Sequence, residues 1–241
     1  MPRATLAPVR LSLLGVCLLH PPGSDEPVAV PGTAKRLLAL LALSGPRARP
    51  YVAGTIWPDL DEGHAQGALR SAIYRLNQIE PDLLDCKDDV LMLGRSVAVD
   101  VHELRCCCEA ILSGRVDDAA RPILLGHNHE LLPGWYDDWV VFERERLRQL
   151  RLQALEVLSE RLLAENRLPE AAQAALEAVT IEPLLESAQR QLMRIHLAAA
   201  NSVEAIRQYD LYRQLLHREL GIEPSPAMRS LIDPIVVGVA T

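Results

Sequence analysis

The sequence predicts a mainly α-helical chain, with an N-terminal winged helix-turn-helix (α+β) followed by an all-α domain of tetratricopeptide-like (TPR-like) helical repeats. Three observations predict it. Strand-like and helix-like periodicities alternate over the first hundred residues, and no comparable strand signal follows Val101. Pairs of residues in the C-terminal part recur 34 positions apart. Aromatic residues make up only 4% of the 241 residues, which favours helices over a β-sandwich.

The first element is the apolar stretch Val9–Leu19, which fits one buried strand or two short strands meeting near Gly15. A secretory signal is the alternative. We favour strands, because no small-x-small cleavage site follows and the run is shorter than the roughly 20 residues that span a bilayer. Pro27–Val30 predicts a further strand after a Pro-Pro-Gly-Ser turn.

Three helices are expected next. Thr33–Leu43 is apolar and stops at Gly45-Pro46, and Val52–Trp57 is a short helix that ends at Pro58. A longer helix spans about 63–79. Its apolar stripe has helical spacing and consists of Ala65, Ala68, Leu69, Ala72, Leu76 and Ile79.

A β-hairpin is predicted after this helix. Val90–Leu93 and Val97–Val99 are short apolar runs on either side of the turn Gly94-Arg95-Ser96. A helix followed by a two-stranded wing is the arrangement with which a winged helix holds a duplex. Arg95 is then expected at the tip of the wing.

A 34-residue repeat relates the C-terminal helices. Glu170-Ala171 recurs as Glu204-Ala205, and three further pairs share the offset: Leu158 with Leu192, Leu163 with Leu197, and Ala164 with Ala198. This period is typical of TPR helix pairs. Chance similarity between two alanine-rich helices is the alternative. The expected helices are Val101–Leu112, Val116–Leu125, Trp139–Glu165, Pro169–Ile181, Leu184–Ala200 and Val203–Leu220.

The charge balance excludes a protein that coats nucleic acid through bulk positive charge. There are 25 Lys+Arg against 32 Asp+Glu, a formal net charge of −7, and residues 1–105 carry 11 and 12. Any DNA binding must come from a local patch.

Enzyme motifs are missing from the sequence. It has no Gly-Lys dipeptide for a P-loop, no G-x-G-x-x-G, no G-x-S-x-G and no H-E-x-x-H. We therefore expect neither an enzyme nor a cofactor.

Histidine and cysteine residues suggest one weak metal alternative. His102 and Cys106 would share a helix face, and His127 and His129 flank Asn128, but the paired C-x-x-C geometry of structural zinc sites is missing. No metal is expected. The five cysteines are an odd number with three consecutive, which fits a reducing cytoplasm better than a disulfide framework.

The outer face of the 63–79 helix is the candidate DNA contact. Polar side chains that can hydrogen-bond base edges or phosphates lie opposite its apolar stripe. A solvated helix face is the structural alternative. With the wing, the candidate DNA-binding residues are Gln66, Arg70, Ser71, Tyr74, Arg75, Asn77 and Arg95.

The order of these pieces resembles the Streptomyces antibiotic regulatory protein (SARP) family. The matching segments are 33–43, Trp57-Pro-Asp59, 68–76 (Ala-Leu-Arg-Ser-Ala-Ile-Tyr-Arg-Leu), 97–104, 131–139 (Leu-Leu-Pro-Gly-Trp-Tyr-Asp-Asp-Trp), Glu143-Arg-Glu-Arg-Leu147 and 219–226 (Glu-Leu-Gly-Ile-Glu-Pro-Ser-Pro). Together these segments extend over nearly the whole chain.

The resemblance implies a transcription regulator with a response-regulator-type (OmpR/PhoB-like) winged helix over 1–101 and a bacterial transcriptional activator domain over 102–241. Within it, 68–76 matches the recognition helix, which makes Arg70 and Arg75 DNA contacts. Such regulators bind promoter repeats side by side, as a possible homodimer on double-stranded DNA, and engage RNA polymerase to activate transcription. No membrane partner is implied.

One departure from the family pattern leaves a second function open. Where the family has further basic residues after the recognition segment, this chain has Asn77-Gln78-Ile79-Glu80. The alternative is therefore a protein-interaction scaffold, in which a degenerate winged helix is attached to TPR-like repeats.

Overall fold

The computed structural model describes residues 8–115, 121–126 and 130–233. The chain forms two compact units, one of residues 1–104 with 128–145 and one of residues 105–127 with 146–241. The mainly helical fold class with a small N-terminal α+β part is confirmed.

The first sheet of the N-terminal unit contains β1 (Val9–Ser12), β2 (Leu18–His20) and β6 (Val97–Val99), in the order β2-β1-β6. β1 runs antiparallel to β2 and parallel to β6. Gly15 lies between β1 and β2 with a φ of 81°, a left-handed conformation that glycine adopts without steric cost. The reading of Val9–Leu19 as two short strands is therefore correct.

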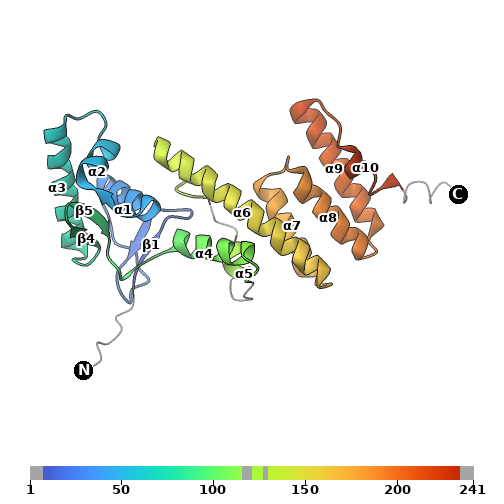
Figure 1. The fold of residues 1–241 in the computed structure, drawn as a ribbon, viewed down its shortest axis with the longest axis horizontal. Helices are drawn as coiled ribbons and strands as arrows, with labels where there is room; N and C mark the ends of the chain where they lie inside the picture. Colours follow the sequence, from blue (N-terminus) through green and yellow to red (C-terminus); the bar gives the residue numbers. More distant parts are fainter. Residues whose placement is uncertain (1–7, 116–120, 127–129, 234–241) are drawn as a thin grey trace, which may run out of the picture. The chain divides into compact units, whose positions relative to one another are not determined.

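Three helices complete the helix-turn-helix core: α1 (Gly32–Ser44), α2 (Arg49–Ile56) and α3 (Glu62–Ile79). α1 is buried without interruption from Leu37 to Leu43. α3 packs against both α1 and α2 (Figure 1). The predicted 63–79 helix is confirmed to within one residue.

The wing is formed by other strands than the sequence suggested. The second sheet contains β3 (Arg47–Ala48), β4 (Leu84–Lys87) and β5 (Val90–Leu93), in the order β3-β5-β4. β5 pairs antiparallel with β4, whereas β6 pairs with β1 in the other sheet. The expected hairpin of Val90–Leu93 with Val97–Val99 is therefore wrong.

The predicted turn itself exists, but it connects the two sheets. The Val97 N–H donates to the Gly94 carbonyl at 3.1 Å, and the Gly94 N–H donates to the Leu83 carbonyl at 2.9 Å. A Cβ on Gly94 would lie only 1.9 Å from the Asp82 carbonyl oxygen. Only glycine fits this close backbone approach.

The Asp100 carboxylate ties the start of α4 to the end of β1. It accepts the backbone N–H groups of Leu13 at 2.9 Å, Leu14 at 3.0 Å and Val101 at 2.8 Å. Burial raises the pKa of this carboxyl group above its usual value, and the three N–H donors partly offset that shift.

A distant segment joins the same strand end. The Leu132 N–H donates to the Leu13 carbonyl at 2.9 Å, and the Gly15 N–H donates to the Glu130 carbonyl at 2.8 Å. The Arg144 side chain donates to the carbonyls of Leu131 and Leu132. These bonds explain why residues 128–145 belong to the N-terminal unit.

The described residues of the second unit form helices that are joined by turns and short connections. Its elements are the C-terminal part of α4 (Asp100–Leu112), α5 (Arg121–Leu124), the larger part of α6 (Asp138–Ala164), α7 (Leu168–Ile181), α8 (Glu186–Ala198), α9 (Ser202–Leu220) and α10 (Pro226–Arg229). α7, α8 and α9 pack side by side in sequence order (Figure 1). The expected helix Val116–Leu125 lies partly outside the described residues.

The backbone repeats with the sequence at the 34-residue offset. Asn166 lies in the turn between α6 and α7, and Ala200 lies at the equivalent position between α8 and α9. Their φ values are 60° and 57°. The Arg167 N–H donates to the Leu162 carbonyl and the Asn201 N–H to the His196 carbonyl, each at 2.8 Å. Both are the six-to-one bonds of a Schellman turn. The TPR-like repeat is therefore confirmed.

Among the described helices, none has the length and apolar character needed to span a membrane.

We expect Asp100→Asn to destabilise the folded chain by about 2 kcal/mol, because one of the two carboxylate oxygens that accept backbone N–H groups becomes an NH₂ group, which cannot accept them. The folded-state pKa of Asp100 is raised, so its contribution is largest below the unfolded-state pKa and falls as pH rises through the folded-state pKa. Urea denaturation across pH checks both effects. The variant should lack this part of the pH dependence, and the exposed-site control Asp25→Asn should retain it.

Gly94→Ala should cost roughly 3 kcal/mol, because the backbone of Asp82 or Gly94 must move to accept the Cβ. Gly54→Ala in α2 is the matched control. No atom lies within 4 Å of a Cβ there, and alanine is the better helix former, so this change should stabilise the chain. Denaturation midpoints compare the two, and equal effects would contradict the steric explanation.

Candidate nucleic-acid interface

The start of α3 is capped by carboxylates. The Asp61 side chain accepts the His64 backbone N–H at 3.1 Å and also contacts the His64 ring. Hydrogen bonds from the His64 ring and backbone lower the pKa of Asp61 below its usual value. The positive end of the helix dipole stabilises the carboxylates of Asp61 and Glu62, and their negative charges repel a phosphate at this end. A phosphate contact is therefore better placed further along the helix.

The outer face of α3 displays six of the seven predicted DNA-binding residues. The buried side of the helix consists of Ala65, Leu69, Ala72 and Leu76. On the opposite side, Arg70, Ser71, Tyr74, Arg75 and Asn77 are exposed and Gln66 is half-buried. With 3.6 residues per turn, Tyr74 points directly away from the core, and it is 66% exposed.

The two cations of α3 lie on opposite edges of this outer face. Neither Arg70 nor Arg75 forms an ion pair with a described residue of the chain. Guanidinium groups bind phosphates or guanine edges with paired N–H donors. The Ser71 hydroxyl donates to the Gly67 carbonyl at 3.1 Å and retains its acceptor capacity. The face can therefore hydrogen-bond a groove edge and hold phosphates on both sides.

Arg95 is exposed but does not lie where the sequence placed it. It occupies the turn between β5 and β6, which belong to different sheets, so it is not at the tip of the wing. That placement was wrong because the wing is β4–β5. A role for Arg95 in DNA binding stays a prediction.

The true tip of the wing is acidic. It consists of Asp88 and Asp89, which are both exposed and have φ values of 49° and 64°. Aspartate tolerates this left-handed region better than most residues, and two such positions form the tight turns that suit hairpins. The Arg49 N–H donates to the Asp89 carbonyl at 3.1 Å, and the Arg49 Nε lies 3.8 Å from the Asp89 carboxylate.

Cations beside the wing were missed by the sequence analysis. Arg47 begins β3, Arg49 follows it, and Lys87 ends β4. The Arg47 guanidinium lies 5.6 Å from the centre of the Tyr51 ring, a cation–π distance. β3 has only two residues, so no periodicity identifies it. The Arg-Ala-Arg sequence at 47–49 is the only signal in this segment.

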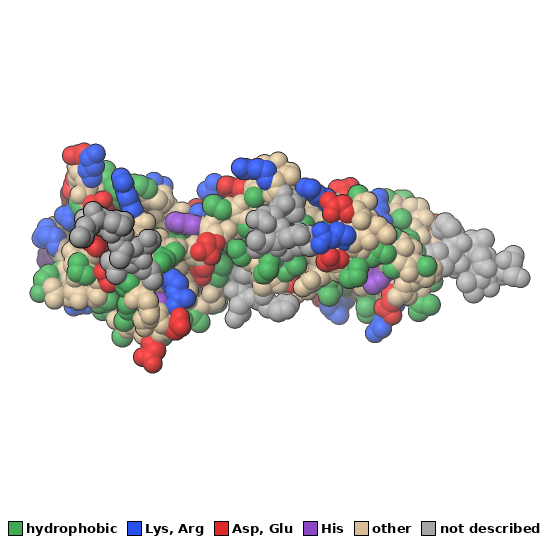
Figure 2. All heavy atoms as spheres, turned by 90° about the horizontal axis from the view of Figure 1, so that it is seen from below, with side chains coloured by type: hydrophobic (Ala, Val, Ile, Leu, Met, Phe, Trp, Pro, Cys, Tyr) green, Lys and Arg blue, Asp and Glu red, His purple; other side chains and the backbone are tan. Residues whose placement is uncertain are grey.

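Charges of both signs are interspersed on the face drawn in Figure 2, where the blue and red side chains alternate without a large patch of one sign. This fits the net charge of −7. No group of three or more metal-ligating side chains occurs among the described residues, and His127 and His129 lie outside them.

Two comparisons give matches. Residues 123–236 match the family model of the bacterial transcriptional activator domain. A solved structure of Mycobacterium tuberculosis EmbR, in complex with a low-affinity phosphopeptide, superposes with a TM-score of 0.70 at 19% sequence identity. The match covers 95% of this chain and 65% of the EmbR chain, so this chain spans about two thirds of that protein. No curated protein matches the chain.

The EmbR likeness confirms the fold, in which a winged helix precedes TPR-like helices. The family match independently identifies the C-terminal half. Both findings agree with the resemblance to SARP regulators: residues 123–236 are similar to a bacterial transcriptional activator domain, and the fold of the chain is similar to that of EmbR.

Proposed function

We propose that this chain is a sequence-specific, DNA-binding transcriptional activator that binds promoter repeats through α3. The outer face of α3, with exposed Arg70 and Arg75 on its two edges, is the observation that carries the proposal. A helix of this type enters the major groove with its outer face toward the base edges. Ser71 and Tyr74 then lie nearest the groove floor, and the arginines reach base edges or phosphates.

The remaining assignments belong to the same proposal. Residues 1–101 are the DNA-binding domain and 102–241 the activator domain, which contacts RNA polymerase. Side-by-side protomers, as a homodimer on DNA, occupy the promoter repeats in the cytoplasm. The proposal needs no catalysis, cofactor or metal.

Selection of fragments from a genomic DNA library at low salt tests the proposal. An enriched repeated element supports it. The logarithm of the affinity should then fall linearly with the logarithm of salt concentration, with a slope of roughly −0.9 per neutralised phosphate. We expect only a few phosphates per protomer, because α3 carries two cations.

Arg70→Ala combined with Arg75→Ala should reduce affinity for the selected element at least about a hundredfold and flatten the salt slope by about two. The matched control removes Arg207 and Arg218 on α9, which are 70% and 71% exposed. It has the same charge change and should bind normally. Circular dichroism verifies that each variant is folded. Unchanged DNA binding by the folded α3 variant would contradict the proposal.

The acidic wing tip favours a second candidate function, a protein-interaction scaffold with a degenerate winged helix. Asp88 and Asp89 stand where a winged helix that grips DNA would place a cation. The scaffold requires that the full chain enrich no DNA at low salt and that residues 102–241 retain a protein partner.

Asp88→Asn combined with Asp89→Asn should strengthen DNA binding about three- to tenfold at low salt, because two carboxylates near the phosphates are removed. Asparagine tolerates the left-handed backbone, so the turn is kept. Asp25→Asn with Glu26→Gln, both exposed in the β2–α1 connection, is the charge-matched control. Electrophoretic mobility shifts at two salt concentrations compare them. No gain over the control would place the wing away from the DNA.

A further inference from the structure

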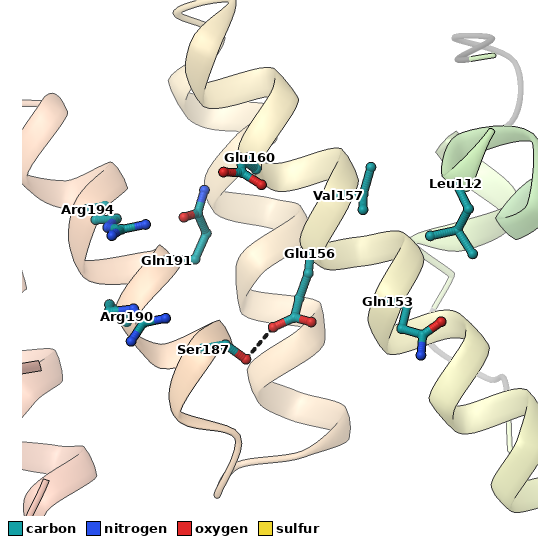
Figure 3. A pocket seen from close by; sticks show the side chains of 9 residues that line it. All are labelled: Leu112, Gln153, Glu156, Val157, Glu160, Ser187, Arg190, Gln191 and Arg194. Atoms are coloured by element: carbon teal, nitrogen blue, oxygen red, sulfur yellow. Dashed lines mark hydrogen bonds between the residues drawn. The ribbon is translucent and has the colours of Figure 1, made fainter. Parts of the chain in front are cut away.

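A groove of about 500 Å³ lies between α6 and α8 in the repeat unit. Figure 3 shows its two walls. Gln153, Glu156, Val157 and Glu160 line it from α6, and Ser187, Arg190, Gln191 and Arg194 line it from α8, with Leu112 of α4 near the α6 wall. None of these residues is among the predicted DNA contacts.

The walls are equivalent positions of two successive repeats. Each α8 residue follows its α6 counterpart by 34 positions, so Gln153 corresponds to Ser187, Glu156 to Arg190, Val157 to Gln191 and Glu160 to Arg194. The repeat therefore keeps the groove-lining positions and reverses their charge. One wall carries two carboxylates a helical turn apart, the acidic rail, and the other carries two guanidinium groups a turn apart, the basic rail.

The opposed charges of the rails do not neutralise each other. Within the described part of the chain, no ion pair or hydrogen bond engages Glu160, Arg190 or Arg194. Glu156 accepts the Ser187 hydroxyl across the groove, which the dashed line in Figure 3 marks. The remaining charged groups are available to a ligand.

Gln191 supplies an independent sign of a missing partner. Its side chain is only 9% exposed, and its Nε2 is buried without a hydrogen-bond partner. Leaving a buried amide unsatisfied is costly, and a rotation of this side chain toward the groove would let a peptide carbonyl accept its N–H. Beside it, Val157 and Leu112 are 40% and 39% exposed, so the groove also offers apolar surface.

We propose that this groove binds an extended peptide segment of a partner protein in which basic and acidic residues alternate. Side chains of an extended strand point alternately to opposite sides, and those on one side repeat about every 6.7 Å. Charges one turn apart on a helix repeat about every 6 Å. Successive basic side chains thus meet Glu156 and Glu160, and successive acidic side chains meet Arg190 and Arg194.

Other occupants match the rails less well. A segment with one sign of charge would meet a rail of like charge, and a nucleic acid backbone would meet the acidic rail. Two copies of this chain, placed groove to groove, can oppose unlike rails. Two hollow surfaces would however enclose unfilled space, which costs packing energy.

The test uses the full chain and fluorescent octapeptides of lysine and glutamate. In one peptide the two residues alternate, and in the other the same residues are grouped in two blocks. Fluorescence anisotropy at low salt should show binding of the alternating peptide and at least about tenfold weaker binding of the block peptide. Equal affinity for the two peptides, or binding of neither, overturns the proposal.

Charge-reversal variants test the rails themselves. Arg190→Glu with Arg194→Glu should weaken the alternating peptide about tenfold, and adding Glu156→Arg with Glu160→Arg should restore it, because the rails are exchanged. Arg207→Glu with Arg218→Glu on α9 is the charge-matched control and should bind normally. Full binding by the first variant overturns the proposal. Sedimentation provides a second check. If the chain self-associates through the rails and the alternating peptide does not disrupt this association, the proposal is also overturned.

Discussion

The Asp100 carboxylate is the constraint on which the N-terminal unit depends. It accepts hydrogen bonds from the backbone N–H groups of Leu13, Leu14 and Val101. The end of β1 and the start of α4 therefore cannot separate without leaving these donors unpaired. β6, which ends at the preceding residue, is thereby held parallel to β1. The carbonyl of Leu13 is at the same time the acceptor for Leu132. The carboxylate thus joins the end of β1 to the start of α4, and the Leu13 carbonyl joins a third segment, at Leu132, to the same strand end.

Local patterns predicted the helices well and the strand pairing poorly. The α3 stripe and the 34-residue repeat are periodic signals of long elements, and both were confirmed. The wing was misassigned because β4, Leu-Asp-Cys-Lys, is mostly exposed and shows no apolar alternation. β6 resembled the partner of β5 across a turn, but its real partner, β1, lies nearly ninety residues earlier. Pairing over such a separation leaves no trace in local sequence.

The site residues illustrate the same limit. A helix stripe predicts its own opposite face, so the exposed positions of α3 follow from the sequence alone. The charge of the wing tip cannot be predicted in this way, because it depends on which two residues form the turn. Asp88 and Asp89 became the tip, and Arg95 did not, once β4 was the partner of β5. The family model covers residues 123–236 and therefore does not reach the wing, and a likeness to EmbR at 19% identity shows the fold without the charge of individual positions.

The charges around α3 determine how strongly the proposed DNA binding depends on neighbouring protomers. In the N-terminal unit, the basic edges of α3 are accompanied by carboxylates at its start and at the wing tip. In the proposed DNA complex, these carboxylates limit the number of phosphates that one protomer neutralises. Weak binding by one module becomes strong when neighbouring modules bind adjacent sites, because the second event is effectively intramolecular. Adjacent promoter repeats supply those sites in the proposed function. A thin basic face thereby makes binding depend on repeat number and spacing, so a single half-site elsewhere in a genome competes poorly.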